Sequence, residues 1–463
     1  MERQASGVVV VMVPLAAQGH LNQLLHLTRI ISTRGLPVHF IGSATHNRQA
    51  KDRVHGWDPS TTSNIHFHDF QLPHIVTPPP DPHATEKFPT HLLPLFEAGV
   101  HFREPLGELL RVLSTTNQRV VVVYDSSMAF AAHEASFVSK AEAYCFIPCS
   151  AFTVLHFIWE SMGKPAYEEG SLFPEELPRI SLDASLSERF LEFSNQNTQW
   201  SNLYCAGNIY NTCNVIEAKY VDSLAQTEPS KKYWAIGPFN PVTFGSTTTG
   251  TPRHRCLEWL DKQPPSSVIY VSFGTMTSIS DDQIAELAIG LERSEQRFIW
   301  VLRDADLGDI YTEESRKAQL PDGFEERIGG VGMVVRDWAP QVQILAHPST
   351  GGFMSHCGWN STMESLSMGV PIAAWPMHSD QPRNALLVTD LLKVGLIVRD
   401  WECRKNLISS DIIESSIKKL MVSDEGSMMR KKAHELGANI REAVSEGGTS
   451  VIQLESFLSH ISR

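Results

Sequence analysis

Two side chains suited to proton transfer come shortly after apolar runs that read as strands. His20 stands in the turn after the run 8–13, and Asp125 follows the run 120–124. The pKa of an unperturbed histidine lies near neutrality, so an imidazole can accept the proton of an alcohol as that alcohol attacks. A carboxylate beside the imidazole would fix its tautomer and stabilise the imidazolium. Each residue alone also has an ordinary interpretation, His20 as a structural histidine and Asp125 as a helix N-cap.

A second set of polar side chains stands at the start of an expected helix. Ser361 and Glu364 have the spacing of a capping box, and Gly369 is well placed to end the helix. A helix N-terminus at the carboxyl edge of a parallel sheet binds anions, and His356 and Asn360 would add donors there. The pattern indicates a phosphate site, although Ser361 and Glu364 by themselves would also suit a plain cap.

Such side chains meet only if strands bring them to a common edge. Short β-branched runs alternate with amphipathic stretches such as 21–34 and 281–293, which indicates parallel sheets covered by helices. We expect buried strands at 8–13, 38–41, 120–124, 268–273, 298–302, 333–335 and 371–375. The predicted fold class is therefore α/β.

The run 245–252 is small, polar and unfavourable to helices, as linkers between domains are. It separates two sets of strands, so we expect two domains with a cleft between them. The predicted organisation is a first domain at 1–240, a linker at 241–253, a second domain at 254–440 and a C-terminal helix at 441–463 that packs back on the first domain. The proline- and histidine-rich segment 74–94 reads as a loop or short helices that line the site.

The composition excludes several classes of partner. A net charge of −13 argues against a nucleic-acid backbone or an anionic membrane as the main partner. The seven cysteines include no Cys-x-x-Cys pair, which favours a reducing compartment over a disulfide framework or a zinc site. The apolar run 8–17 reads as a buried strand and not as a signal peptide, and no run has the length of a membrane span. We expect a cytoplasmic monomer.

The segment 338–381 carries a pattern of unusual residues. It contains Trp338-Ala339-Pro340-Gln341, then Ser355-His356-Cys357-Gly358-Trp359-Asn360-Ser361, and it ends in Asp380-Gln381. In residue types and in length, this segment strongly resembles the signature box of the plant family 1 UDP-glycosyltransferases. The resemblance implies a GT-B fold, in which two Rossmann-like domains with parallel sheets face each other across a cleft. It also implies that the small-molecule partners are a UDP-sugar donor and an acceptor.

The resemblance implies a role for each matching residue. Trp338 would stack on the uracil, Glu364 would bind the ribose hydroxyls, and the donors around Asn360 would bind the diphosphate. The turn after the strand 268–273 would add further diphosphate contacts, although that turn alone is also typical of ordinary loops. Gln381 is typical of enzymes that use UDP-glucose, with UDP-xylose as the open alternative. The residues assigned to the UDP-sugar are Ser272, Thr275, Trp338, Ala339, Gln341, His356, Trp359, Asn360, Ser361, Glu364, Asp380 and Gln381.

The family's catalytic base and the acid that orients it match His20 and Asp125. The resemblance thus implies that His20 takes the proton of the acceptor hydroxyl and that the attack inverts the anomeric centre, giving a β-glucoside. We expect neither a metal ion nor a cofactor beyond the donor. Many relatives carry proline where this chain has Gln23, a difference that we expect to alter the entry to the helix and not the chemistry.

The acceptor is indicated by resemblance alone. The stretches 46–51, 64–70, 210–212, 300–306 and 375–384 resemble the zeatin O-glucosyltransferases of this family. This implies transfer of glucose to the side-chain hydroxyl of a cytokinin, with flavonoid or terpenoid alcohols as the alternative. Candidate acceptor-pocket residues are Phe88, Phe96, Met128, Phe152, Trp159, Phe193 and His378, each of which core packing would also explain. Ser150 is a candidate sugar contact or else an ordinary loop serine.

Two functions of other classes fit the sequence less well. An NAD(P)-dependent oxidoreductase would carry a Gly-x-Gly-x-x-Gly turn after its first strand, where this chain has Gln18-Gly19-His20. A non-catalytic sensor of sugar nucleotides would be expected to lose His20 or Asp125, and both residues are present.

Overall fold

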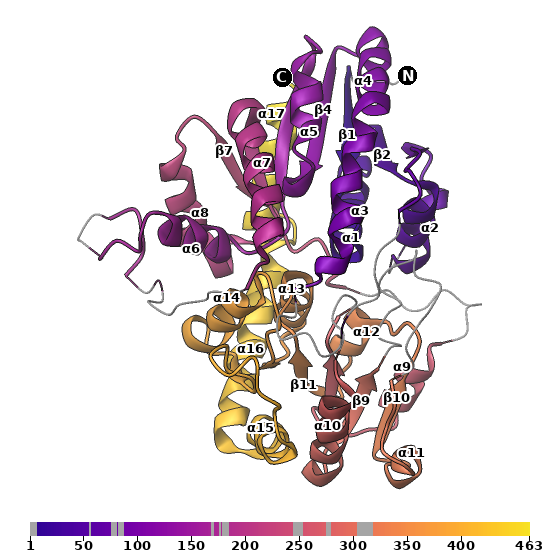
Figure 1. The fold of residues 1–463 in the computed structure, drawn as a ribbon, viewed down its shortest axis with the longest axis vertical. Helices are drawn as coiled ribbons and strands as arrows, with labels where there is room; N and C mark the ends of the chain where they lie inside the picture. Colours follow the sequence, from indigo (N-terminus) through magenta and orange to yellow (C-terminus); the bar gives the residue numbers. More distant parts are fainter. Residues whose placement is uncertain are drawn as a thin grey trace.

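Each half of the protein is built on one parallel sheet covered by helices (Figure 1). The computed structural model describes residues 7–54, 57–75, 81, 88–167, 171–175, 177, 185–243, 253–274, 279–302 and 318–463. Of the expected segments, 76–80 and 82–87 in the proline- and histidine-rich stretch, 244–252 in the linker and 303–306 in the stretch 300–306 lie outside the described residues.

Within the described residues, the first sheet has the strand order β3-β2-β1-β4-β5-β6-β7. Its strands are β1 (Val8–Val13), β2 (Val38–Gly42), β3 (Ile65–Asp69), β4 (Arg119–Asp125), β5 (Ala141–Ile147), β6 (Cys205–Tyr210) and β7 (Lys232–Ala235). Its helices are α1 (Gln18–Ser32), α2 (Ala44–Arg53), α3 (Leu93–Ala98), α4 (Arg103–Thr116), α5 (Phe130–Ser136), α6 (Ala151–Ser161), α7 (Glu188–Tyr204) and α8 (Asn214–Thr227).

The second sheet has the order β10-β9-β8-β11-β12-β13 in the same part of the chain. Its strands are β8 (Val268–Ser272), β9 (Arg297–Val301), β10 (Gly332–Val335), β11 (Thr350–Ser355), β12 (Ile372–Ala374) and β13 (Gly395–Ile397). The helices that follow β7 are α9 (Arg255–Leu260), α10 (Asp281–Ser294), α11 (Phe324–Arg327), α12 (Gln341–Leu345), α13 (Trp359–Met368), α14 (Gln381–Leu386), α15 (Ser410–Val422), α16 (Asp424–Ala443) and α17 (Thr449–Ile461).

The valine-rich sequence of β1 reflects the burial of this strand on both faces of the first sheet. Val9, Val11 and Val13 pack into the core on one face of the sheet, and Val8 and Val10 pack into the core on the other. Because successive strand residues point to opposite faces, a strand buried on both faces must be apolar throughout. The same pattern predicted β2, β4, β8, β9, β10 and β12, and those strands are confirmed within one or two residues.

Six further strands were not predicted, because their sequences do not have this pattern. β3 contains His66 and His68, and β11 contains Gly351 and Gly352. Polar or glycine-rich strands are stabilised by their neighbours in the sheet and have little intrinsic strand preference of their own. Their positions therefore depend on the assembled sheet.

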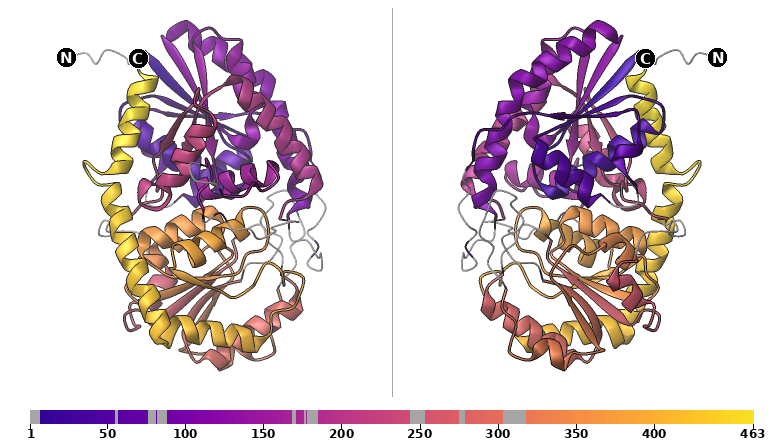
Figure 2. Two further views of the ribbon diagram at one scale, coloured as in Figure 1. Left: turned by 90° about the vertical axis from the view of Figure 1, so that its left-hand side faces the viewer. Right: turned by 90° about the vertical axis from the view of Figure 1, so that its right-hand side faces the viewer.

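The C-terminal helices lie along both halves (Figure 2). α16 packs on α13 of the second half, where Arg441 donates to the Ser367 carbonyl at 2.6 Å. α17 then packs on the first sheet, where the Phe457 ring lies 5.5 Å from that of Tyr144 and 5.1 Å from that of Trp234. The chain thus returns to its first half at its end.

We expect Phe457→Ala to lower the free energy of unfolding by about 3–5 kcal/mol, because removing a fully buried ring leaves a cavity. Ile452→Ala in the same helix is the matched control: Ile452 is 56% exposed, and its loss should change stability by about 0.5 kcal/mol or less. Urea unfolding followed by circular dichroism measures both variants. Equal effects would contradict the packing of α17 on the first sheet.

Candidate active site

The two proton-transfer residues meet at the carboxyl edge of the first sheet. β1 and β4 are neighbours, with Val13 paired to Tyr124. His20 lies in the first turn of α1, and Asp125 is the last residue of β4. His20 Nδ1 lies 2.6 Å from Asp125 Oδ2, and the Ser127 amide donates to Asp125 Oδ1 at 3.0 Å. The structure therefore brings these two residues into hydrogen-bonding contact.

The surroundings of this pair suit a general base. Asp125 is fully buried, whereas the side chain of His20 is 26% exposed. Burial lowers the pKa of His20, but the charge and hydrogen bond of Asp125, with the charge of Asp380, outweigh burial and raise the pKa above its ordinary value. Because Nδ1 faces the carboxylate, Nε2 is the ring nitrogen that can take a proton.

A tight turn after β11 places His356 at the carboxyl edge of the second sheet. Its imidazole lies between two glycines: a Cβ on Gly358 would be 2.5 Å from His356 Nε2, and a Cβ on Gly274 would be 2.8 Å from it. Burial lowers the pKa of His356 to about 4, so the ring is neutral at pH 7. Its buried Nδ1 has no hydrogen-bond partner among the described residues, which leaves that atom able to bind a ligand.

The interpretation of Ser361 and Glu364 as a capping box is wrong. α13 begins at Trp359, so Ser361 lies inside the first turn and cannot be the N-cap. Both side chains bind Gln341 instead, whose Nε2 lies 2.9 Å from Ser361 Oγ and 2.6 Å from Glu364 Oε2. The predicted end of the helix is confirmed, because Gly369 has a φ of +76° as its C-cap.

Glu364 and Trp338 form the end of the site nearest α12. Burial raises the pKa of Glu364 to about 7, although the hydrogen bond from Gln341 opposes that shift. Arg53 of the first half places its guanidinium 5.5 Å from the centre of the Trp338 ring, and its Nη1 donates to Gln18 Oε1 at 3.2 Å. Arg53 was not predicted, because it lies outside the matched stretch 46–51 of α2 and far from Trp338 in the sequence.

The start of α13 also contacts the turn that carries His20. Asn360 Nδ2 donates to the Gly19 carbonyl at 2.7 Å, and Trp359 Nε1 donates to the Asn211 carbonyl at 2.9 Å. The N-terminus of α13 therefore adjoins the His20–Asp125 pair across the boundary between the two halves. A positively polarised helix end in that position would favour a negatively charged group beside His20.

Asp380 and Gln381 stand at the start of α14 on the same side. Asp380 Oδ2 accepts a hydrogen bond from Asn384 Nδ2 at 2.7 Å, and burial raises the pKa of Asp380 although that bond lowers it. Gln381 Oε1 accepts from the amides of Met377 and His378 at 2.9 and 3.1 Å. The carbonyl of Gln381 thus stabilises the preceding loop, and its amide nitrogen lies 3.3 Å from His378 Nε2.

The remaining candidate contacts for the UDP-sugar lie in different environments. Ser272 is the buried last residue of β8, and Ala339 is buried beside Trp338. Thr275 lies outside the described residues. Ser150 is fully buried and caps α6, and its Oγ lies 2.9 Å from Asn384 Oδ1.

The candidate acceptor residues fall into two groups. Phe88, Phe96 and Met128 belong to one hydrophobic cluster, and the partly buried Phe193 packs against it. The Phe88 ring also lies 5.9 Å from that of His378, and Phe190, which was not predicted, lies 5.0 Å from Phe88. Phe152 and Trp159 belong to a separate cluster on α6. The structure therefore unites the Phe88 group with His378 and separates it from the α6 pair.

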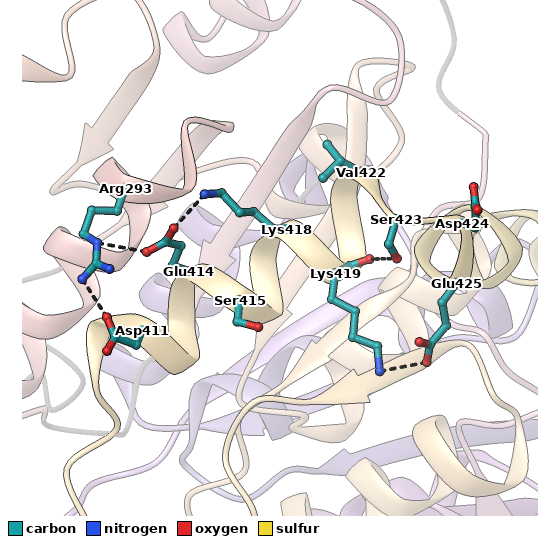
Figure 3. A pocket seen from close by; sticks show the side chains of 10 residues that line it. All are labelled: Arg293, Asp411, Glu414, Ser415, Lys418, Lys419, Val422, Ser423, Asp424 and Glu425. Atoms are coloured by element: carbon teal, nitrogen blue, oxygen red, sulfur yellow. Dashed lines mark hydrogen bonds and ion pairs between the residues drawn. The ribbon is translucent and has the colours of Figure 1, made fainter.

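A hollow on the outer side of the second half is lined by none of the candidate catalytic, UDP-sugar or acceptor residues (Figure 3). It lies along α15 and the start of α16, and its charged side chains pair with one another. Arg293 contacts Asp411 at 2.7 Å and Glu414 at 2.9 Å, and Lys419 contacts Glu425 at 2.9 Å. α10 and α15 are at the end of the molecule remote from the boundary between the halves (Figure 1), so this hollow is separate from His20.

Metal-binding clusters and membrane-spanning helices are both absent from the described residues. No group of three or more His, Cys, Asp or Glu side chains there is arranged to hold a metal ion. The sequence Asp304-Ala305-Asp306, which has the form of a metal motif, lies outside those residues, so the expectation of a metal-free reaction stays a prediction. No helix within the described ranges is long and apolar enough to cross a membrane.

Comparisons with known proteins identify the family of this chain. The family model described as glycosyltransferase, N-terminal domain, matches residues 6–241, and the one described as UDP-glucoronosyl and UDP-glucosyl transferase matches residues 223–431. Zeatin O-glucosyltransferase of Phaseolus lunatus is 51% identical over 98% of this chain and 97% of its own length. Zeatin O-xylosyltransferase of Phaseolus vulgaris is also 51% identical, over 98% of each chain.

Solved structures show the same architecture. A UDP-glucosyltransferase from Polygonum tinctorium matches with a TM-score of 0.78 at 28% identity, over 98% of each chain. The Phytolacca americana enzyme UGT2, complexed with UDP-2fluoro-glucose and pterostilbene, matches with a TM-score of 0.77 at 26% identity, over 98% of this chain and 100% of its own. The predicted GT-B fold is therefore confirmed, and the chain belongs to the plant family 1 UDP-glycosyltransferases, enzymes that transfer a sugar from a UDP-sugar donor.

Proposed function

We propose that this protein transfers glucose from UDP-glucose to the side-chain hydroxyl of a zeatin-type cytokinin, with inversion at the anomeric carbon. The observation that carries the proposal is the 2.6 Å contact of His20 with Asp125, one residue from the Gly19 carbonyl that Asn360 contacts. A base on one half thus adjoins a helix N-terminus on the other. That arrangement suits attack by an alcohol on a sugar whose leaving group is a diphosphate.

In the proposed reaction, His20 Nε2 takes the acceptor's hydroxyl proton as the oxygen forms a bond to the anomeric carbon. The bond from that carbon to the phosphate oxygen breaks on the opposite face, and UDP departs with both electrons of the bond. Asp125 holds the imidazole by Nδ1 and stabilises the imidazolium. The N-terminus of α13, which His356 adjoins, would stabilise the charge that develops on the diphosphate. The proton on His20 then passes to solvent.

The proposed contacts with the UDP-sugar follow the order of the residues in the segment 338–381. Trp338 would stack on the uracil, and Glu364, which Gln341 orients at 2.6 Å, would accept from the ribose hydroxyls. Asp380 and Gln381 would bind the sugar. Gln381 favours glucose, but the glucosyl- and xylosyltransferase relatives are equally similar to this chain, so the comparisons do not choose between the two sugars.

The choice of acceptor rests on the printed names of the relatives. Besides the Phaseolus enzymes, cis-zeatin O-glucosyltransferase 2 of Zea mays is 45% identical over 98% of each chain. Flavonol 3-O-glucosyltransferase UGT76E12 of Arabidopsis thaliana is 30% identical over 100% of this chain. The greater similarity to the zeatin enzymes supports a cytokinin acceptor.

Incubation with an equimolar mixture of UDP-glucose and UDP-xylose and an equimolar panel of trans-zeatin, cis-zeatin, a flavonol and a terpenoid alcohol tests substrate choice. We expect a zeatin O-glucoside as the main product. It is identified by its mass and by the release of zeatin when it is treated with β-glucosidase. A flavonol or terpenoid glucoside as the main product would contradict the proposed acceptor. A xyloside as the main product would contradict the proposed donor.

We expect His20→Ala to lower kcat by about 10²–10⁴-fold, because the acceptor hydroxyl then lacks its general base. The Kd for UDP, measured by calorimetry, should stay within about twofold of the wild-type value, since the UDP residues lie on the other half. His101→Ala, which removes an exposed imidazole from the same half, is the control and should leave kcat unchanged. Normal turnover by His20→Ala would remove His20 as the base.

The pH dependence of kcat should also report His20. Because neutral His20 is the reactive form, kcat at saturating substrates should fall as the pH drops through its raised pKa. Asp125→Asn removes the charge that raises this pKa, so the acidic limb of the profile should move to lower pH while the maximal kcat falls. An acidic limb at the same pH in both proteins would show that another group controls it.

A further inference from the structure

One amide on α14 connects the two halves of the site. Asn384 is fully buried, and both ends of its amide have partners. Its Nδ2 donates to the Cys357 carbonyl at 2.9 Å and to Asp380 Oδ2 at 2.7 Å. Its Oδ1 lies 2.9 Å from Ser150 Oγ and 3.1 Å from Thr153 Oγ1, both at the start of α6 in the other half. Two acceptors use both protons of Nδ2. Ser150 Oγ and Thr153 Oγ1 also lie 2.7 Å from each other, so one hydroxyl proton lies between them and the other is donated to Oδ1.

We infer that Asn384 is a positioning residue that aims the Asp380 carboxylate at the donor's sugar and is itself held in place at Oδ1 by the Ser150 and Thr153 hydroxyls on α6. The inference rests on the proposed function, in which Asp380 binds sugar hydroxyls. It assigns Ser150 a different task from the predicted sugar contact, because Ser150 would act through Asn384 without touching the sugar.

The partners of Asn384 allow one orientation of the amide. With Oδ1 toward α6, it accepts from hydroxyl groups, and Nδ2 faces two acceptors, the Cys357 carbonyl and the Asp380 carboxylate. A flipped amide would place its carbonyl oxygen against those two acceptors, and a buried unsatisfied polar group is costly. The Cys357 carbonyl and the Asp380 carboxylate therefore specify which end of Asn384 meets Asp380, and the α6 hydroxyls supply the donor that holds the other end. One Asp380 oxygen is fixed in this way, which orients the carboxylate.

The neighbouring Arg383 makes it possible to distinguish the positioning of Asp380 from the general attachment of α14 to α6. Arg383 is also buried, and it binds the α6 side chains Glu160 and His156, the latter at 3.2 Å. Its guanidinium lies 3.7 Å from the centre of the Phe157 ring. Arg383 thus joins α14 to α6 as Asn384 does, but its hydrogen bonds go to α6 and Ser185 and not to the sugar-binding carboxylate. It provides a matched control.

The test compares binding of UDP with binding of UDP-glucose, because only the second ligand carries the sugar. Asn384→Asp keeps the shape of the side chain but cannot donate to Asp380. We expect the Kd for UDP-glucose to rise roughly 10- to 100-fold, the worth of a hydrogen bond to a charged group. The Kd for UDP should change by about twofold or less. Calorimetry without acceptor measures both constants.

A second substitution covers the case in which Asn384→Asp does not fold. Thr153→Val keeps the volume of the side chain and removes one hydroxyl from Asn384 Oδ1. It should raise the Kd for UDP-glucose relative to that for UDP in the same direction, by about threefold to tenfold. Arg383→Lys should lower the melting temperature and change the two Kd values by the same factor.

A ratio of the two Kd values that stays at the wild-type level in Asn384→Asp and Thr153→Val would overturn the inference. A shift of that ratio in Arg383→Lys as large as in the other variants would overturn it too, because any loosening of α14 would then suffice. Failure of the wild-type protein to bind UDP would have a different meaning: it would refute the proposed function, and the inference with it.

Discussion

The hydrogen bond from Asn360 to the Gly19 carbonyl joins the two halves where their functional groups must meet. Gly19 precedes His20, and Asn360 lies in the first turn of α13, so this 2.7 Å bond brings the catalytic pair beside the helix N-terminus. Neither sheet carries both parts of the site. Polar groups buried between two domains lower stability unless they find their partners, so these contacts favour one relative position of the halves.

Electrostatics distinguish His20 from the buried groups on the other side. Burial lowers the pKa of His356 and raises that of Glu364, so each is shifted toward its neutral form. A neutral His356 and a carboxyl group that titrates near pH 7 suit hydrogen bonding to a ligand that brings its own charge. The pKa of His20 is raised despite burial, because Asp125 stabilises the imidazolium. His20 is therefore the imidazole of the site whose charged form is stabilised, which suits the proposed role of base.

Residues that sit at strand ends or in a continuous motif could be predicted from the sequence, and residues that act through distant contacts could not. Apolar β-branched runs predicted β1 and β4, and therefore the edge at which His20 and Asp125 meet. The roles of Arg53 and Asn384 depend on how the halves pack, and that of Phe190 on how α7 packs within the first half, and no local pattern encodes either. The capping-box interpretation of Ser361 failed for a related reason: the i, i+3 spacing was correct, but the distant Gln341 binds both side chains.

The return of α17 to the first sheet has a mechanical consequence. The chain crosses between the halves twice, first between β7 and α9 and again between α16 and α17. Two bodies joined at one point can swivel and twist freely, whereas two joined at separate points keep mainly the rotation about the line through both. Any opening of this enzyme to exchange substrates is therefore restricted by two connections and not by one.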